Sequence, residues 1–309
     1  MGRELKVLVP DGPLRRELEP LPDGVQLVAE PGPDVEFVIV NFEIADRLPG
    51  VLEEMPRLRV VQSLSAGVDW LLPKVPAGIV VCRAVGVHDV PVSEWVVAAI
   101  LAMQRRLPEF IEFQRRAEWN RSPADDAKID DLDGHTVLVV GYGSIGRALA
   151  ARLGPFGVRV IGVARNGRDG VQPVSALPEL LPRADVVANL LPLTPETDKF
   201  VDAAFLALMK PGALLVNAGR GKTVDTEALL TALQAGRIRA ALDVTDPEPL
   251  PDGHPLWNAP NILITPHIAG GVARWSARGY RFAGEQIRRY VAGQPLLGIE
   301  AGAVDLKLT

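Results

Sequence analysis

The chain has 309 residues, of which 48% are hydrophobic and 23% are charged, a composition that supplies a sizeable core and, at roughly 150 residues per domain, predicts two domains. The formal net charge of −5 argues against a polyanion-binding surface, so we expect no nucleic-acid partner. Apolar stretches stay shorter than the ~18 residues of a membrane span, so we expect no membrane partner. The single cysteine, Cys82, fits a reducing compartment, so we expect a cytoplasmic protein.

The N-terminal third of the chain alternates short apolar runs with segments that contain Gly, Pro or Asp. We predict buried strands at four of these runs, which are Lys6–Pro10, Val25–Val28, Phe37–Val40 and Val60–Leu64. Short buried strands separated by about 15 residues are typical of a parallel sheet with helices between its strands. This part of the chain therefore favours an α/β fold.

From Val92 to Trp119 the pattern changes, because apolar residues recur at helical spacing. The spacing predicts one or two long helices around Pro108. Charged residues of both signs are interleaved along this stretch, at Arg105, Arg106, Glu109, Glu112, Arg115 and Arg116. They fit either a solvated face with mixed ion pairs or a subunit interface.

A second and more regular series of apolar runs follows the polar stretch Asn120–Asp133. Six strands are predicted in it, at Thr136–Val140, Val158–Val163, Ala184–Leu190, Ala213–Asn217, Ala240–Val244 and Ile262–Thr265. A final helix is predicted over Arg274–Val291. Six short strands with helices between them predict a doubly wound sheet.

The first strand of this series leads into a glycine-rich segment, Gly141-Tyr142-Gly143-Ser144-Ile145-Gly146, which opens a helix. Between a strand and a helix, this pattern is typical of dinucleotide binding. Gly141 permits the tight turn, Gly143 lets the backbone approach a pyrophosphate, and Gly146 lets the helix pack on the strand. The helix N-terminus offers its N–H groups to the phosphates. The alternative is a turn with a purely structural role.

The end of the second strand bears on the choice between NAD and NADP. An NAD site usually has an acid there, which accepts hydrogen bonds from the ribose hydroxyls. Here the strand ends on Ala164 and Arg165, Arg168 follows, and the first acid is Asp169. The two arginines fit a 2′-phosphate held by charge-assisted bonds, or else are solvated loop residues. We expect NADP to be preferred, with NAD as the alternative cofactor.

The fourth, fifth and sixth of these strands are followed by polar residues whose chemistry fits one reaction. Arg220 follows the fourth strand, Glu248 the fifth and His267 the sixth. Because carboxyl ends of parallel strands line the ligand crevice of an open sheet, we expect these side chains at one site. Singly, each has a structural alternative, as a surface ion pair, a turn acid or a buried histidine. One cysteine and four scattered histidines predict no metal site.

At these motifs the chain resembles the D-isomer-specific 2-hydroxyacid dehydrogenase family. The segments that fit are Ser65–Asp69, Ser93–Trp95, Gly141–Gly146, Leu191–Thr194, Asn217–Gly221, Asp243–Pro249, His254–Trp257 and Thr265–Gly270. The resemblance implies two doubly wound parallel-sheet domains with a cleft between them. A flavodoxin-like substrate domain would comprise residues 1–93 and 281–309, and a Rossmann-type cofactor domain would comprise residues 94–280.

The resemblance also implies a role for each site residue. Arg220 would bind the carboxylate of a 2-keto acid, His267 would donate the proton to its carbonyl oxygen, and Glu248 would stabilise the imidazolium. The N–H groups of Ala66 and Gly67 would complete carboxylate recognition, and Asp243 would bind the nicotinamide carboxamide. The expected cofactor contacts are Gly141, Gly143, Ser144, Ile145, Gly146, Arg165, Arg168, Leu191, Pro192, Ala218, Asp243, His267 and Gly270.

The implied reaction is hydride transfer between NADP(H) and a small 2-keto or D-2-hydroxy acid. Glu248 argues against formate, because formate dehydrogenases of this superfamily have Gln at that position. The basic end of the second strand resembles the glyoxylate/hydroxypyruvate reductase branch, so we expect one of those two acids to be reduced by a homodimer. The alternatives are 3-phosphoglycerate or another D-2-hydroxy acid oxidised with NAD, and a dinucleotide-sensing, corepressor-like binding protein.

Overall fold

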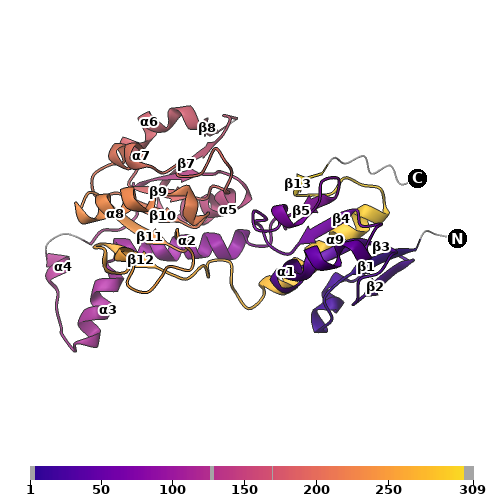
Figure 1. Cartoon of the computed structure of the whole chain (residues 1–309). Coiled ribbons are helices and arrows are strands. Elements are labelled where there is room, and N and C mark those ends of the chain that lie inside the picture. Colours follow the sequence, from indigo (N-terminus) through magenta and orange to yellow (C-terminus); the bar gives the residue numbers. More distant parts are fainter. Residues whose placement is uncertain (1–3, 126–128, 169, 303–309) are drawn as a thin grey trace. The chain divides into compact units, whose positions relative to one another are not determined.

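The computed structural model describes residues 4–125, 129–168 and 170–302, and the chain divides into two compact units (Figure 1). Unit 1 comprises Met1–His88 and Val272–Thr309, and unit 2 comprises Asp89–Gly271. The sequence places these divisions later, at 93/94 and 280/281. Those positions fall inside α2 (Asp89–Gln104) and α9 (Trp275–Val291), each of which packs as a whole within one unit.

Unit 1 contains a six-stranded sheet in the order β13-β5-β4-β3-β1-β2. Its strands are parallel except β13, which runs antiparallel to β5. The strands are β1 (Leu5–Leu8), β2 (Val25–Val28), β3 (Val35–Val40), β4 (Val60–Ser63), β5 (Val80–Cys82) and β13 (Ile299–Ala301). The four strands predicted in the N-terminal third are confirmed. The sequence does not predict β5 and β13, because three-residue strands are too short to show a periodic pattern.

Helices cover both faces of this sheet. On one face α9, drawn in yellow in Figure 1, and the short helix Pro13–Leu18 share an apolar cluster with Val7, Phe37 and Val60. On the other face α1 (Phe42–Val51) contributes Leu48 to a second cluster. Two further short 3₁₀ segments are Leu52–Glu54 and Leu72–Lys74. Successive side chains of a strand thus pack into apolar clusters on opposite faces of the sheet. Because both faces are buried, these strands are apolar throughout.

Unit 2 contains a seven-stranded sheet in the order β12-β11-β10-β9-β6-β7-β8, with every pair parallel. Its strands are β6 (Thr136–Val140), β7 (Arg159–Ala164), β8 (Val171–Pro173), β9 (Val186–Asn189), β10 (Leu214–Asn217), β11 (Arg239–Leu242) and β12 (Ile262–Ile264). Six of these were predicted, and the three-residue edge strand β8 was not. The predicted α/β class with two doubly wound sheets is confirmed.

The helices of unit 2 lie in two layers. In one layer, α2 and α5 pack on Val137 and Val139 of β6, and in the other, α7 and α8 pack on Leu138 and Val140. The helices after α2 are α3 (Leu107–Arg115), α4 (Ser122–Asp125), α5 (Ser144–Leu153), α6 (Leu177–Leu180), α7 (Ala203–Leu208) and α8 (Thr226–Gln234). Short 3₁₀ segments are Gly154–Phe156, Val174–Ala176, Leu181–Arg183, Gly221–Thr223 and Pro255–Asn258.

The helical stretch predicted from Val92 forms two helices rather than one. α2 ends at Gln104, and Arg106 has a left-handed backbone with a φ of 52°, which α-helical geometry does not allow. Pro108 lies in the first turn of α3, where its missing N–H costs no hydrogen bond. The break therefore falls just before the proline.

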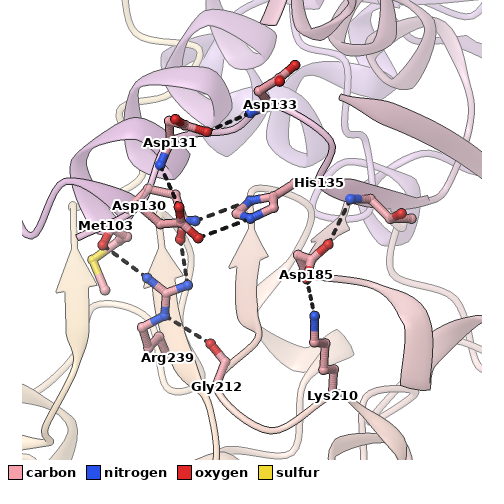
Figure 2. A network of polar contacts seen from close by, with 11 residues as sticks. Met103, Asp130, Asp131, Asp133, His135, Asp185, Lys210, Gly212 and Arg239 are labelled. Carbon is pink, nitrogen blue, oxygen red and sulfur yellow. Dashed lines mark hydrogen bonds and ion pairs between the residues drawn. The ribbon is translucent and has the colours of Figure 1, made fainter. Parts of the chain in front are cut away.

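Polar side chains gather at the rim of unit 2 where the strands begin (Figure 2). Arg239, the first residue of β11, donates to the carbonyls of Met103 (3.1 Å) and Gly212 (3.0 Å) and to Gln104 Oε1 (2.6 Å). Met103 and Gln104 are the last two residues of α2. These bonds therefore fasten the end of that helix to the start of β11.

Asp185, at the same rim, accepts from the Thr136 N–H (2.8 Å) and from Lys210 Nζ (2.6 Å). Burial opposes the ionisation of Asp185, but the hydrogen bonds from Lys210 and Thr136 and the charge of Lys210 outweigh it and hold the pKa of the carboxyl below its ordinary value. A carboxyl whose folded-state pKa is lowered contributes stability above its unfolded-state pKa.

We expect this contribution to be lost as the pH falls below about 4, through the folded-state pKa of Asp185. Asp185→Asn should lower the free energy of unfolding near neutral pH and make its decline in acid less steep. Urea denaturation across a pH series measures both effects. Asp252→Asn, on an exposed loop, is the matched control. An unchanged acid slope in Asp185→Asn would contradict the prediction.

Candidate functional site

The carboxyl ends of six strands of unit 2 lie in register along one rim of the sheet. Paired residues join each strand end to the next in the series Val163, Val140, Asn189, Asn217, Leu242 and Ile264. Most segments singled out in the sequence of this unit follow these ends, whereas Ser93–Trp95 lies within α2. The structure thus places the glycine-rich turn, Arg220, Glu248 and His267 on loops of a single rim.

The glycine-rich turn has the geometry that a dinucleotide needs. Gly141 has a φ of 92°, and a Cβ there would lie 2.8 Å from the carbonyl carbon and oxygen of Leu190, so only glycine fits. α5 begins at Ser144 with Gly143 as its N-cap and with no capping side chain. The first N–H groups of the helix are therefore available to an anion, and the helix dipole favours one. These residues fit a pyrophosphate.

Two arginines lie beside the loops that follow β6 and β9. Arg168 Nη2 donates to the Tyr142 carbonyl within the glycine-rich turn (2.8 Å), and Arg165 Nη2 lies 3.5 Å from Glu196 Oε2. The side chains of Arg165 and Glu196 are 72% and 67% exposed, so their ion pair is weak and a ligand can displace it. Asp169 lies outside the described residues.

Glu196 is an acid that sequence reasoning missed, because it follows β9 rather than β7. It accepts from Thr194 Oγ1 (2.8 Å) as well as facing Arg165. The hydrogen bond from Thr194 and, to a smaller extent, the charge of Arg165 hold the pKa of Glu196 below its ordinary value. An ionised acid therefore lies next to one of the two candidate phosphate ligands.

His267 and Glu248 form a direct contact. His267 Nδ1 lies 2.5 Å from Glu248 Oε1, although the residues belong to loops after different strands, β12 and β11. Their side chains are 49% and 39% exposed, so the pair is accessible from outside the unit. Because the carboxylate engages Nδ1, Nε2 is the ring atom that can meet a substrate.

The loop that carries His267 is held in a strained conformation by Asp243. His267 has a φ of 54°, a left-handed backbone that few side chains adopt. Its N–H donates to the Asp243 carbonyl (2.7 Å), and the Asp243 carboxylate accepts from the N–H groups of Ile268 (2.9 Å) and Ala269 (2.8 Å) and from Thr265 Oγ1 (2.6 Å). The resemblance assigns Asp243 to the nicotinamide carboxamide, and in the structure this buried carboxylate binds the loop of His267.

Arg220 lies between β10 and the short helix Gly221–Thr223. Its Nη1 donates to the Gly219 carbonyl (2.9 Å), and its own carbonyl accepts from Asn217 Nδ2 (3.1 Å) and Thr223 Oγ1 (2.6 Å). Asn217 and Thr223 are fully buried. Arg220 is half-buried, and these two hydrogen bonds fix the backbone of its loop, so its guanidinium is suited to bidentate binding of a carboxylate.

The remaining predicted contacts are distributed over both units. Leu191, Pro192 and Ala218 lie on loops after β9 and β10, and Gly270 lies three residues after His267, all in unit 2. Ala66 and Gly67 belong to unit 1, on the half-buried loop that follows β4. In that loop the Ser65 N–H donates to Ser63 Oγ (3.0 Å).

His254, which lies in one of the motif segments, has a structural role. Its Nδ1 accepts from the Leu256 N–H (3.2 Å) and caps the short helix Pro255–Asn258. Within the described ranges, no group of three His, Cys, Asp or Glu side chains is arranged to hold a metal ion. In the same part of the chain, every helix is too short or too polar to cross a membrane.

Comparison with known proteins agrees with this geometry. Residues 97–269 match the model of the NAD binding domain of D-isomer specific 2-hydroxyacid dehydrogenases. The chain is 35% identical over 255 residues to a glyoxylate reductase of Thermofilum pendens, covering 79% of this chain and 75% of the relative. It is 33% identical over 324 residues to a D-3-phosphoglycerate dehydrogenase of Mycobacterium leprae, covering 97% of this chain but 60% of that longer protein.

A solved structure extends the likeness to the whole fold. It is an NADPH-dependent glyoxylate/hydroxypyruvate reductase of Sinorhizobium meliloti in complex with NADP and sulfate, with a TM-score of 0.80 and 27% identity over 98% of each chain. The similarity to these proteins therefore covers both the sequence and the fold of this chain. The chain belongs to the D-isomer-specific 2-hydroxyacid dehydrogenases, oxidoreductases that act on CH–OH donors.

Proposed function

We propose that the protein uses NADPH to reduce a small 2-keto acid, glyoxylate or hydroxypyruvate, to the corresponding 2-hydroxy acid. The observation that carries the proposal is the contact between His267 and Glu248 on the rim that also carries Arg220. When bound, the nicotinamide supplies the hydride that the keto carbon accepts. The chain itself must then bind the carboxylate, polarise the ketone and deliver one proton.

His267 delivers that proton in the proposed mechanism. Nε2 of the imidazolium gives its proton to the carbonyl oxygen as the hydride reaches the carbon, so that C=O becomes CH–OH and the ring becomes neutral. Glu248 stabilises the charged ring before transfer and fixes its orientation through Nδ1. Histidine suits this work because its ordinary titration lies near neutral pH.

Arg220 binds the carboxylate of the keto acid in the proposed mechanism. A guanidinium offers two parallel N–H donors to a carboxylate and places positive charge close to the neighbouring ketone oxygen. Glyoxylate and hydroxypyruvate are favoured as substrates because relatives and a structural neighbour carry those names.

Steady-state assays with a panel of acids test this function. Glyoxylate, hydroxypyruvate, pyruvate and 3-phosphohydroxypyruvate would each be assayed with NADPH and with NADH. We expect the highest kcat/KM for glyoxylate or hydroxypyruvate with NADPH. Faster turnover of the phosphorylated acid with NADH would support the phosphoglycerate alternative. Binding of dinucleotide without turnover of any acid would support a corepressor-like binding protein.

We further propose that Arg165 and Arg168 hold the 2′-phosphate of NADP. A preference for NADPH of about 10- to 100-fold, equivalent to about 1.4–2.7 kcal/mol, is expected from two exposed charge-assisted contacts. Arg165→Ala with Arg168→Ala should remove that preference by raising Kd for NADPH, with NADH binding nearly unchanged. Calorimetric titration measures both affinities, and added salt should weaken NADPH binding more than NADH binding.

Glu196 supplies the matched control for this prediction. Glu196→Gln removes the negative charge next to Arg165 and should tighten NADPH binding, the opposite of the arginine substitutions. Arg165→Ala alone separates the charge effect from any change in the turn, because Arg168 also binds the Tyr142 carbonyl. Equal affinity of the unmodified protein for NADH and NADPH would overturn the assignment.

We also propose that the protein is a cytoplasmic homodimer. α3 and the segment after it expose apolar side chains, with Leu107 48%, Ile111 47% and Trp119 96% exposed, which favours a second copy as the covering partner. Sedimentation velocity tests the dimer, and a monomer at micromolar concentration would contradict it. The only cysteine, Cys82, is a buried free thiol, which suits a reducing compartment.

A further inference from the structure

A chain of buried polar groups runs beneath the loop of Arg220. It begins at Asn189, the last residue of β9, which is fully buried between β6 and β10. Asn189 Nδ2 donates to Asn217 Oδ1 (3.2 Å) and to Thr223 Oγ1 (2.7 Å). An amide at the end of an otherwise apolar central strand costs desolvation energy unless its hydrogen bonds are made. Here they are made to Asn217, the last residue of β10, and to Thr223, in the short helix that follows it.

The two partners of Asn189 both act on the backbone of Arg220. Thr223 Oγ1 (2.6 Å) and Asn217 Nδ2 (3.1 Å) donate to the Arg220 carbonyl. The directions are consistent, because Thr223 accepts from Asn189 and donates onward, and Asn217 accepts on its oxygen and donates from its nitrogen. A satisfied buried network of this kind fixes one backbone position. The buried side chains of Asn217 and Thr223 therefore fix the backbone of the Arg220 loop.

The other end of the Asn189 side chain faces the loop that follows β9. Asn189 Oδ1 accepts from the Leu191 N–H (3.3 Å). The peptide group between Leu190 and Leu191 is enclosed by two glycines, since a Cβ on Gly141 would lie 2.8 Å from the Leu190 carbonyl oxygen and one on Gly219 would lie 2.9 Å from the Leu191 nitrogen. One side chain thus contacts the loops of both the proposed dinucleotide site and the proposed carboxylate site.

We propose that Asn189 is a positioning residue, acting through Asn217 and Thr223 to set where the Arg220 guanidinium meets the substrate carboxylate. The inference rests on the proposed role of Arg220. Displacement of a reacting or anchoring group by about 1 Å is enough to cost a large factor in rate. Asn189 also couples the two sites, because any shift of its side chain moves the Leu191 peptide and the Arg220 carbonyl together.

Thr223 offers the cleanest test, because valine has its shape without the hydroxyl. Thr223→Val should lower kcat/KM for the keto acid about tenfold, the rate equivalent of one lost buried hydrogen bond, mostly by raising KM. Thr223→Ser keeps the hydroxyl and should restore most of the loss. Thr231→Val is the matched control, since that exposed hydroxyl bonds only the Glu227 carbonyl within α8.

Asn189→Leu tests the coupling at its origin. It removes the bonds to both loops, so KM for the keto acid and Kd for NADPH should rise together, whereas Thr223→Val should leave Kd for NADPH nearly unchanged. Calorimetry gives Kd without turnover, and thermal melting shows whether each variant is folded. If Asn189→Leu does not fold, the Thr223 pair still decides the proposal.

A double-mutant cycle separates positioning from general weakening of the structure. If Thr223 acts through Arg220, Thr223→Val should cost little in an Arg220→Lys background, because the fork it positions is already gone. Equal losses in both backgrounds, or equal losses in Thr223→Val and Thr223→Ser, would overturn the inference. If the unmodified protein reduces none of the keto acids, the proposed function fails instead, so the two failures are distinguishable.

Discussion

His267→Ala is expected to lower kcat for keto-acid reduction by about 10²–10⁴-fold, the usual contribution of a positioned acid. The reason is the arrangement at Nδ1, where Glu248 at 2.5 Å orients the ring and leaves Nε2 as the atom that can donate the proton. Kd for NADPH should change far less than kcat. His254→Asn is the matched control, because asparagine can still cap the short helix that His254 caps.

Glu248→Gln probes the same pair without changing its size. The amide can still bond the ring, but it carries no negative charge to stabilise the imidazolium, so kcat should fall. Wild-type kcat in this variant would assign Glu248 a purely structural role. Near-wild-type turnover in His267→Ala would remove His267 from the mechanism altogether.

Arg220→Lys is expected to lower kcat/KM for the keto acid by about 10²-fold or more, even though the positive charge is kept. Lysine has no planar fork, so it loses the bidentate contact, and the loss of one fixed donor at a reacting carbonyl has an effect of this size. Steady-state kinetics measure the effect, and calorimetry should show NADPH binding within a fewfold of wild type.

Lys222→Ala is the control for the charge of this loop. Lys222 lies two residues after Arg220 and is exposed, so its removal should leave kcat/KM close to the wild-type value. Equal activity of Arg220→Lys and the unmodified protein would mean that the carboxylate meets a point charge and that the buried support under Arg220 serves stability alone.

The sequence predicts the elements around the glycine-rich turn better than the hydrogen bonds that hold the loops of the site. The strand Thr136–Val140, the turn and α5 follow from a local pattern, and the contact of Glu248 with His267 follows from their places after neighbouring strands. The distance between them does not, because it depends on the path of the loop after β11. The strained φ of His267 likewise depends on the hydrogen bonds that its loop donates to Asp243, which no local pattern reveals.

Asn189 illustrates what a single sequence cannot supply. An asparagine at the end of an apolar run signals a buried polar group, but its partners Asn217 and Thr223 lie about 30 residues away and meet it only because β9 and β10 pair in parallel. Glu196 was missed for a related reason, since its relation to Arg165 depends on the order of β6, β7 and β9 in the sheet.

The Arg239 network has a consequence for laboratory evolution of this protein. β11 has four residues, from Arg239 at one rim to Leu242 next to Asp243 at the other, which separates the two rims by roughly 10–13 Å. Substitutions separated by more than about 7–10 Å and without shared partners usually have additive effects. A library of variants at the Arg239 rim can therefore be selected for heat tolerance, and a separate library at the His267 rim for new substrates. Substitutions selected at the two rims can then be combined in one gene, and their effects should add.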